Sequence, residues 1–432
     1  MVKNIFSKLI TFFSIGGMKT KFYGRLIIAL LVVTLALIAP VASYNLNLND
    51  GISATITGSD SVEGISSPAG TATLATGSIQ AAVDAAIDGA TIYLLAKIYA
   101  ENVMVDKSLG IKGTCAGSTI VDGDQKDSVF MIGANKPNVD VILSGMTIRD
   151  GLARWGDQIG RHGGGGIFNN GRLTVKNCDF ENNMAIEGGG IYNTKNGMVT
   201  VKNSIFEGNV EYQGGNGASI FNLGTMDLKN CIFLRNTANT AGNIFNGVQG
   251  IVNVKNCIIA QNTAYFCGAG FENSGKLTIK NSWITDNTAG HGTAIDNWEG
   301  GQVDVINSYI TNNRAVPCPT DAGSGAGIDN HPGGTVNVIN SYITQNIASG
   351  SGGGINNYPT ATVTVTNSEI SGNTANSGGG IYNGGTLNLV RDVIKENAAT
   401  GGPGSGGGIY NVGTMTKKAC IVKGNQPEDI AP

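Results

Sequence analysis

The chain has 432 residues, of which 65 are glycine and only 14% are charged, and its net charge is −3. Glycine reaches about twice its usual share of about 7%, but no strict Gly-X-Y triplet runs through the sequence, which excludes a collagen triple helix. A net charge so close to zero gives no electrostatic basis for nucleic acid as a partner.

Residues 1–43 have the organisation of a secretory signal peptide. Lysine and arginine residues precede the apolar run 26–39, and the small residues at 41–43 follow it as a cleavage site. The run is short for a membrane span, although residues 26–42 could serve as an uncleaved anchor. The sequence therefore predicts a secreted or cell-surface protein whose only contact with a membrane is this segment.

Residues 44–75 are rich in serine, threonine and glycine, and we expect them to form a linker ahead of one domain that covers 76–432. Apolar residues at helical spacing predict an amphipathic helix over 78–87. Alternating segments between 91 and 149 then predict about three irregular coils of strand. A helix before the first coil can cover the end of a stacked sheet and protect its unpaired edge.

From about residue 163 to 425 one pattern recurs roughly every 26 positions. Each copy has a glycine run, Gly-Ile-x-Asn, a turn, Leu-x-Val-x-Asn and finally Phe-or-Ile-x-x-Asn. Side chains of a strand alternate between its two faces, so Ile191 and Asn193 are expected to point inward and Tyr192 outward. Three short strands and three bends per turn predict an all-β fold, a single-stranded right-handed parallel β-helix of about 13 coils with an N-terminal capping helix.

Asparagines end each part of the repeat and fall into three columns. Buried asparagines at bends can hydrogen-bond to the backbone and to one another up the stack, and no Asn-x-Ser or Asn-x-Thr sequon occurs, so we expect structural ladders rather than glycosylation. The first column includes Asn193, the third runs from Asn183 to Asn425, and the second contains Asn203, Asn230, Asn256, Asn281, Asn307, Asn340 and Asn367.

Two parts of the sequence resemble known families. Gly-Gly-Gly-Ile-Tyr-Asn at 188–193, 378–383 and 406–411, together with Phe-x-x-Asn, resembles the repeats of polymorphic outer membrane proteins and of adhesin-like surface proteins from methanogenic archaea. Residues 78–113 resemble the N-terminal cap of pectin-lyase-like β-helix proteins. The resemblance implies a secreted or surface-displayed protein, often adhesive, in a superfamily that also contains lyases, hydrolases and inert scaffolds.

The x position of Gly-Ile-x-Asn is predicted to face outward, and acids occupy it in three successive coils. Stacked like charges repel, so the column is either a solvated face or a binding site. Glu272, Asp296 and Asp329 could hold Ca²⁺, which takes carboxylate oxygens, and no other cofactor is expected. The candidate ligand-binding residues of this face, some of whose rings could stack on sugars, are Glu272, Asp296, Trp298, Glu299, Asp329, His331, Asn356 and Tyr358.

The alternative interpretation of the same face is catalytic. Glycoside hydrolysis uses two carboxylates about 5–9.5 Å apart, and Asp296 and Asp329 would be that pair. The resemblance implies that a lyase of this fold also needs an arginine or lysine base, but Arg314 is expected to lie away from the acids. His291, in Gly-His-Gly, is interpreted as an isolated loop residue, and no histidine or cysteine pair has the spacing of zinc ligands.

A second outward column carries lysine in five successive coils and extends for about 20 Å. This basic stripe could bind an anionic wall polysaccharide, or it could simply keep the outer face soluble. Its members are Lys176, Lys202, Lys229, Lys255 and Lys280.

Cys267 and Cys318 fall in predicted loops and are the better candidates for a disulfide among the seven cysteines. Taken together, the sequence favours a non-enzymatic, surface-displayed adhesive or structural protein that engages glycans or cell-envelope polymers. The alternative is a polysaccharide-active enzyme, a glycoside hydrolase or lyase, that uses Asp296 and Asp329. The sequence predicts no oligomeric state.

Overall fold

The computed structural model describes residues 47–48, 52–53, 72–154, 163–239, 242–319 and 321–432. The expected signal peptide, 1–43, and most of the expected linker lie outside these residues. The chain divides into two units, Met1–Pro68 and Ala69–Pro432. In the first, β1 (Asn47–Leu48) and β2 (Ile52–Ser53) pair antiparallel. None of the described helices is long and apolar enough to cross a membrane.

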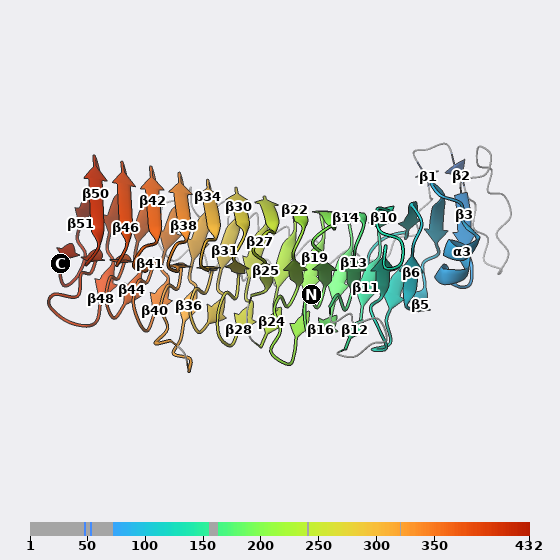
Figure 1. The fold of residues 1–432 in the computed structure, drawn as a ribbon, viewed down its shortest axis with the longest axis horizontal. Helices are drawn as coiled ribbons and strands as arrows, with labels where there is room; N and C mark the ends of the chain where they lie inside the picture. Colours follow the sequence, from blue (N-terminus) through green and yellow to red (C-terminus); the bar gives the residue numbers. More distant parts are fainter. Residues whose placement is uncertain (1–46, 49–51, 54–71, 155–162, 240–241, 320) are drawn as a thin grey trace, which may run out of the picture. The chain divides into compact units, whose positions relative to one another are not determined.

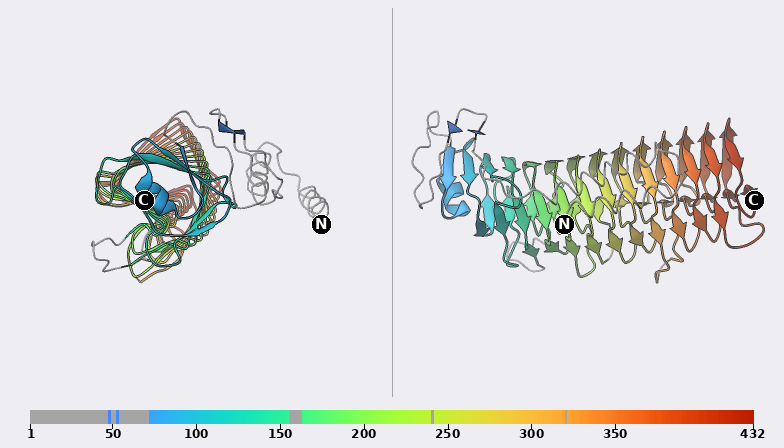
Figure 2. Two further views of the ribbon diagram at one scale, coloured as in Figure 1. Left: turned by 90° about the vertical axis from the view of Figure 1, so that its right-hand side faces the viewer. Right: turned by 180° about the vertical axis from the view of Figure 1, so that it is seen from behind.

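The second unit begins with the predicted capping helix, α3 (Ile79–Ala85). Ser78 caps it, because its Oγ accepts a hydrogen bond from the Ala81 N–H, and the carboxylate of Glu101 accepts two more from the N–H groups of Ile79 and Gln80. Its buried side chains join the core of the coils that follow. Figure 2 shows α3 lying across the end of the stack, as predicted for a cap.

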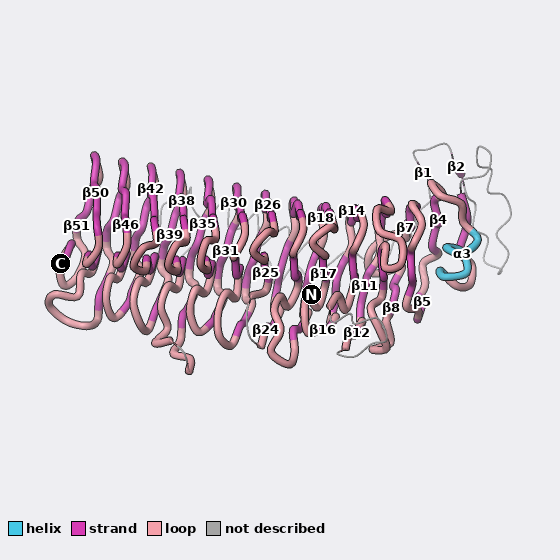
Figure 3. Tube along the Cα trace, in the orientation of Figure 1, coloured by secondary structure: helices cyan, strands magenta, loops and turns pink. Residues whose placement is uncertain are grey.

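The rest of this unit is a coil of short parallel strands that stack into four sheets (Figures 1 and 3). Sheet 1 begins with β3, inside the segment expected to be a linker. Its strands are β3 (Ala72–Ala75), β4 (Thr91–Leu94), β7 (Leu109–Lys112), β10 (Asp140–Ser144), β14 (Arg172–Lys176), β18 (Met198–Lys202), β22 (Thr225–Lys229), β26 (Ile251–Lys255), β30 (Lys276–Lys280), β34 (Gln302–Ile306), β38 (Thr335–Ile339), β42 (Thr362–Thr366), β46 (Thr386–Val390) and β50 (Thr414–Lys418).

Sheet 2 follows sheet 1 in each winding, after a turn at the second asparagine column. Its strands are β5 (Ile98–Ala100), β8 (Ile120–Asp122), β11 (Thr147–Arg149), β15 (Asp179–Glu181), β19 (Ile205–Glu207), β23 (Ile232–Leu234), β27 (Ile258–Ala260), β31 (Trp283–Thr285), β35 (Tyr309–Thr311), β39 (Tyr342–Thr344), β43 (Glu369–Ser371), β47 (Val393–Lys395) and β51 (Ile421–Lys423).

Sheet 3 consists of two-residue strands. These are β12 (Leu152–Ala153), β16 (Met184–Ala185), β20 (Val210–Glu211), β24 (Thr237–Ala238), β28 (Thr263–Ala264), β32 (Thr288–Ala289), β36 (Arg314–Ala315), β40 (Ile347–Ala348), β44 (Thr374–Ala375) and β48 (Ala398–Ala399). The prediction of three strands per coil is therefore wrong for this part of the stack, because a strand of two residues is too short to show an alternating pattern.

Sheet 4 carries the Gly-Ile-x-Asn element and closes each winding. Its strands are β6 (Val103–Val105), β9 (Phe130–Ile132), β13 (Ile167–Asn169), β17 (Ile191–Asn193), β21 (Ile220–Asn222), β25 (Ile244–Asn246), β29 (Phe271–Asn273), β33 (Ile295–Asn297), β37 (Ile328–Asn330), β41 (Ile355–Asn357), β45 (Ile381–Asn383), β49 (Ile409–Asn411) and β52 (Ile430–Ala431). The described sheets 1, 2 and 4 hold 14, 13 and 13 strands, which agrees with the prediction of about 13 coils.

The core runs through the middle of the coil as columns of like side chains. Phe180, Phe206 and Phe233 occupy equivalent positions in three successive windings, with ring centroids 4.3 and 4.7 Å apart, and all three are fully buried. Each buried large apolar side chain contributes roughly 1.5–3 kcal/mol. Stacking thus replaces the globular core that a chain of this length would otherwise need.

The first and third asparagine columns are buried ladders. In the first, each side-chain amide donates to the next one, from Asn169 to Asn193 and onward to Asn411. In the third, the chain of donors starts at Asn183 and ends at Asn425, whose Nδ2 donates to the carboxylate of Asp429. Each of these amides also donates to a backbone carbonyl at a bend. Without this hydrogen bond the carbonyl would be a buried acceptor with no partner.

The second asparagine column has a different role from the buried ladder that we expected. Its members are exposed and have positive φ angles, 51° at Asn203 and 55° at Asn230. Asparagine adopts this left-handed conformation more readily than most residues, so the column forms the turn between sheets 1 and 2. Lateral hydrogen bonds connect only part of it, as between Asn230 and Asn203.

The two kinds of asparagine should respond differently to substitution. Asn236→Ala removes the partner of the Phe206 carbonyl and of the Asn209 amide, and we expect it to cost about 1–3 kcal/mol for each buried group left unpaired. Asn230→Gly keeps the positive φ on an exposed turn and should change the stability little. Thermal denaturation followed by circular dichroism compares them, and equal melting temperatures would contradict the distinction.

One half-buried acid gives a prediction about pH. Asp179 stacks between Thr147 and Ile205, and burial, together with the carboxylates of Glu181 and Glu207, raises the pKa of Asp179 to about 6. Folding therefore favours its protonated form, so this contribution is complete below the unfolded pKa of about 3.9 and is lost as the pH rises through about 6.

Asp179→Asn should therefore raise the melting temperature at pH 8 and change it little at pH 4. The measurement is a series of thermal melts of both proteins between these pH values. A lower melting temperature of Asp179→Asn at pH 8 would instead mean that the folded protein stabilises the carboxylate.

Candidate functional site

The acids predicted to share one face do stack in register. Glu272 of β29 pairs with Asp296 of β33, Asp296 pairs with Asp329 of β37, and Asn356 of β41 continues the column. The expectation that this column faces solvent is wrong. Asp296 and Asp329 are fully buried, and Glu272 and Asn356 are nearly so.

The burial comes from the segments that lead from sheet 3 into sheet 4. They pack with the alanines of sheet 3 into two small apolar clusters. Gly292 and Gly325 lie directly over the acids, and a Cβ atom at these glycines would come within 2.4 Å of Asp296 Cβ and 2.5 Å of Asp329 Cβ, respectively. Both glycines also have positive φ angles, 54° and 60°. The glycine run therefore covers the column because it brings no side chains with it.

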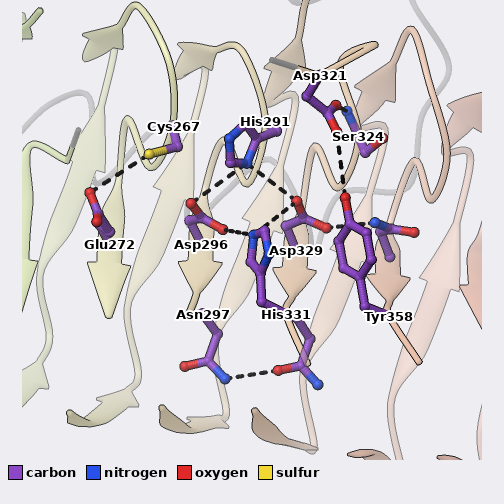
Figure 4. A network of polar contacts seen from close by, with 12 residues as sticks. Cys267, Glu272, His291, Asp296, Asn297, Asp321, Ser324, Asp329, His331 and Tyr358 are labelled. Carbon is purple, nitrogen blue, oxygen red and sulfur yellow. Dashed lines mark hydrogen bonds and ion pairs between the residues drawn. The ribbon is translucent and has the colours of Figure 1, made fainter. Parts of the chain in front are cut away.

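Two histidines meet the acids from opposite sides (Figure 4). His331, which follows β37, places its Nε2 2.9 Å from Asp296 Oδ1 and 3.5 Å from Asp329 Oδ2. His291, in the covering segment, places its Nδ1 3.6 Å from Asp296 Oδ2 and 3.4 Å from Asp329 Oδ2. The interpretation of His291 as an isolated loop residue is wrong, because its loop folds back onto sheet 4.

The four groups influence one another's protonation. Burial opposes the charged form of His291, but the carboxylates of Asp329 and Asp296 outweigh it and raise the pKa of His291 to about 9. The pKa of His331 is raised for the same reason, against burial. Burial also opposes the charge of Asp296, but the hydrogen bond from His331 and the charges of both histidines together outweigh burial and lower the pKa of Asp296. For Asp329, burial together with the charge of Asp296 outweighs the two histidines and raises the pKa of its carboxyl group.

Aromatic rings hold His331 in place. Trp298, His331 and Tyr358 follow β33, β37 and β41 at equivalent positions, and His331 stacks on both, with centroids 4.5 Å from Trp298 and 4.9 Å from Tyr358. Trp298 is 38% exposed, so this stack reaches the surface. Tyr358 Oη lies 3.4 Å from Asp321 Oδ2, which ties the loop over the site to the stack. Glu299 is exposed and lies outside this buried group.

Glu272 has a different neighbour from the other acids. Its Oε2 lies 3.7 Å from the thiol of Cys267, and burial, together with the charge of Asp296, raises the pKa of Glu272 to about 8. Cys267 is a free thiol, so the disulfide expected with Cys318 is absent from the described chain. The contact between Cys267 and Glu272 could not be predicted from the sequence, because it also depends on the folded-back glycine segment.

The lysines of the basic stripe form one column on sheet 1, as the repeat predicted. The five lysines are register partners in successive strands from β14 to β30. Lys229, Lys255 and Lys280 are exposed, and the other two are half-buried. The next strand replaces lysine with Ile306, which ends the stripe. None of the described ion pairs involves these lysines, so their charges face solvent.

A groove of about 700 Å³ lies along sheet 3 and was not predicted. It crosses the windings that contain β20 to β36. Threonines point into it from the strands, and larger side chains border it. The residues that matter for its shape are Tyr212, Thr237, Thr263, Tyr265, Thr288 and Val316.

Comparison with known proteins agrees with this architecture. Residues 166–343 match the family model described as the right handed beta helix region. The described part of the second unit is therefore a right-handed parallel β-helix. The fold that the resemblance to pectin-lyase-like proteins implied is thereby confirmed, and no curated protein sequence matches the chain.

Three solved structures are similar to this β-helix protein at low identity. The A-module of the mannuronan C-5 epimerase AlgE6 from Azotobacter vinelandii has a TM-score of 0.40 and 16% identity, over 82% of this chain and 94% of that chain. The pectin methylesterase of Aspergillus niger has a TM-score of 0.26 and 14% identity, over 76% and 86%. The family PL6 alginate lyase AlyGC has a TM-score of 0.19 and 12% identity, over 79% and 74%.

The buried ion pairs of the β-helix protein predict a large effect for one substitution. Asp296→Asn removes the carboxylate that contacts both histidines, and we expect a loss of about 3–5 kcal/mol because a buried charge then lacks its partner. Thermal denaturation at pH 7 in a buffer with a chelator measures it. Asp227→Asn, at an exposed acid on sheet 1, is the matched control. A similar small shift for both variants would show that the network adds no stability.

Proposed function

We propose that this chain is an exported β-helix protein of the cell surface that binds a linear glycan in the groove of sheet 3. The groove is the observation that carries the proposal. A concave surface of a few hundred Å³ with aromatic walls and a few polar groups is the usual form of a binding site for a small molecule or a polymer segment.

The side chains along one border of the groove alternate in size. At the position that follows each strand of sheet 3, successive windings carry Tyr212, Asn239, Tyr265, Gly290 and Val316. The two tyrosines are therefore two strand spacings apart, roughly 10 Å, which is the scale of two linked sugar rings. Tyr265 is 55% exposed, so its ring is accessible to a ligand. Tyrosine rings offer apolar faces to the C–H groups of sugars and keep a polar tip in water.

The floor of the groove supports hydrogen bonding. Thr237, Thr263 and Thr288 are register partners on β24, β28 and β32, so their hydroxyl groups repeat at the strand spacing of about 4.8 Å. Each hydroxyl can donate one hydrogen bond and accept others, as sugar hydroxyls can. A polymer that lies along the β-helix axis would meet the same pattern in each winding.

The groove suits binding better than hydrolysis. Glycosidases place two carboxyl groups on either side of the scissile bond, but Glu211 is the one acid along the described groove. Its two carboxylate oxygens accept hydrogen bonds from the backbone N–H groups of Gly215 and Asn239. The other acid pair, Asp296 and Asp329, is buried against histidines. These contacts favour the adhesin-like role expected from the sequence over the alternative of a glycoside hydrolase or lyase.

The lysine stripe would add a preference for acidic polymers. It lies on sheet 1, apart from the groove, and its charges would attract uronate or phosphate groups of a cell-envelope polymer over distances of about 8–10 Å at ordinary salt. Export by the N-terminal segment, which the sequence predicts, would place both surfaces outside the cell.

Binding to a panel of neutral and acidic polysaccharides tests the proposal. We expect Tyr265→Ala to weaken binding about tenfold, or about 1.4 kcal/mol, through loss of its stacking surface. Tyr342→Ala is the matched control, because Tyr342 is an exposed tyrosine on sheet 2 whose ring face is covered by Tyr309. Isothermal titration calorimetry measures the affinities.

Two outcomes would contradict the assignment. Loss of binding in a Lys229→Ala, Lys255→Ala double variant, with Tyr265→Ala unchanged, would move the ligand from the groove to the stripe. Release of reducing ends or unsaturated products during the incubation would show turnover and favour the enzymatic alternative.

A further inference from the structure

We propose that His291, Asp296, Asp329 and His331 form a binding site for one divalent transition metal ion of the zinc type. The proposal is independent of glycan binding in the groove. One potential ligand atom from each of the four residues lies within 4.8 Å of the other three. The four residues belong to β33 and β37, which are adjacent in sheet 4, and to the segments next to these strands.

Unpaired atoms aimed at one point carry the proposal. His291 Nδ1, Asp296 Oδ2 and Asp329 Oδ2 are buried and have no hydrogen-bond partner. The nitrogen lies 3.6 Å from the Asp296 oxygen and 3.4 Å from the Asp329 oxygen. Buried polar atoms are almost always satisfied, and each unpaired one costs about 1–3 kcal/mol. A cation between them would satisfy all three at once, and its two positive charges would balance the two carboxylates.

The spacing of the atoms fits a small tetrahedral ion. Zinc binds nitrogen at about 2.0–2.1 Å and carboxylate oxygen at about 2.0–2.2 Å, so two ligands of a tetrahedral site are roughly 3.4 Å apart. Three of the four contacts between histidine nitrogens and aspartate oxygens already measure 3.4, 3.5 and 3.6 Å. His331 Nε2 also contacts the other oxygen of Asp296, Oδ1, at 2.9 Å, and it would have to give up this hydrogen bond to bind the ion together with Oδ2.

The kind of donor separates this site from the calcium site expected from the sequence. Calcium takes six to eight oxygen ligands, whereas imidazole nitrogen suits zinc, copper, iron or nickel. The expected calcium set was Glu272, Asp296 and Asp329. In the structure Glu272 contacts the thiol of Cys267 instead, and the two histidines complete a set of two nitrogens and two oxygens.

Neighbouring residues orient the ligands as the second shell of a metal site does. Asn356 Nδ2 donates to Asp329 Oδ1 at 2.7 Å, which leaves Oδ2 turned toward the histidines. The rings of Trp298 and Tyr358 fix the plane of His331. Such support is typical of a site whose ligands are held in position before the ion arrives.

The site would be structural. Four protein ligands fill a tetrahedral shell, whereas catalytic zinc sites keep one position for water or substrate. The winding between Asn297 and Asn330 is 33 residues long, against 24 for the winding before it and 27 for the one after. The ion would join this long winding to its neighbour at the point where the covering segment packs on sheet 4.

The test is metal binding by the purified, chelator-treated chain. We expect one Zn²⁺ per chain by calorimetry and elemental analysis, a rise in melting temperature with Zn²⁺ that Ca²⁺ does not produce, and a tetrahedral Co²⁺ absorption spectrum. Asn356→Ala should weaken Zn²⁺ binding about 10- to 100-fold, as loss of an outer-shell partner does. Asp329→Asn and His291→Asn, which remove ligands, should weaken it more than that.

Two further variants keep the test decisive where a ligand substitution impairs folding. Asp227→Asn, an exposed acid on sheet 1, should bind like the unchanged chain. Glu272→Gln distinguishes the proposed set of two histidines and two aspartates from the set of three stacked acids. Loss of metal binding in this variant would assign the ion to Glu272, Asp296 and Asp329. A preference for Ca²⁺ over Zn²⁺, or no bound metal in the unchanged chain, would overturn the proposal.

Discussion

The constraint on which this molecule depends is the exact superposition of one winding on the next. Parallel hydrogen bonds between windings place each residue directly over its equivalent, so a side chain finds its own kind above and below it. This is why columns of phenylalanine, isoleucine and valine can serve as a core. The same constraint places Asp296 over Asp329, so two residues that are 33 positions apart in the sequence belong to one cluster of side chains.

Much of the fold could be predicted because each copy of the sequence repeat forms one winding of the structure. The inward positions of Ile191 and Asn193, the capping helix and the lysine column all follow from period-2 alternation and a fixed repeat length. The two-residue strands of sheet 3 could not be predicted, since two residues contain no alternation. The turn role of Asn203 and its equivalents was also missed, because asparagine serves equally well in a buried ladder and in an exposed left-handed turn.

The candidate site was predicted in its register but not in its environment. The sequence placed Glu272, Asp296 and Asp329 in one column, and it placed Trp298, His331 and Tyr358 beside them. It could not reveal that the glycine run folds back over the column, because glycine is compatible with both an open loop and close backbone contact. His291 was therefore interpreted as a loop residue outside the site. The useful signal would have been its position, four residues ahead of an inward isoleucine in a segment that otherwise carries small or polar side chains.

The asparagine ladders give the β-helix a direction. Every buried amide in the first and third columns donates toward the C-terminal end of the stack, from Asn169 to Asn411 and from Asn183 to Asn425. Aligned amide dipoles add and polarise one another, so the two columns act as a macrodipole in a unit whose described residues form a single short helix, α3. Its positive pole is at the last winding, where the carboxylate of Asp429 accepts from Asn425 as an anion does at a helix N-terminus.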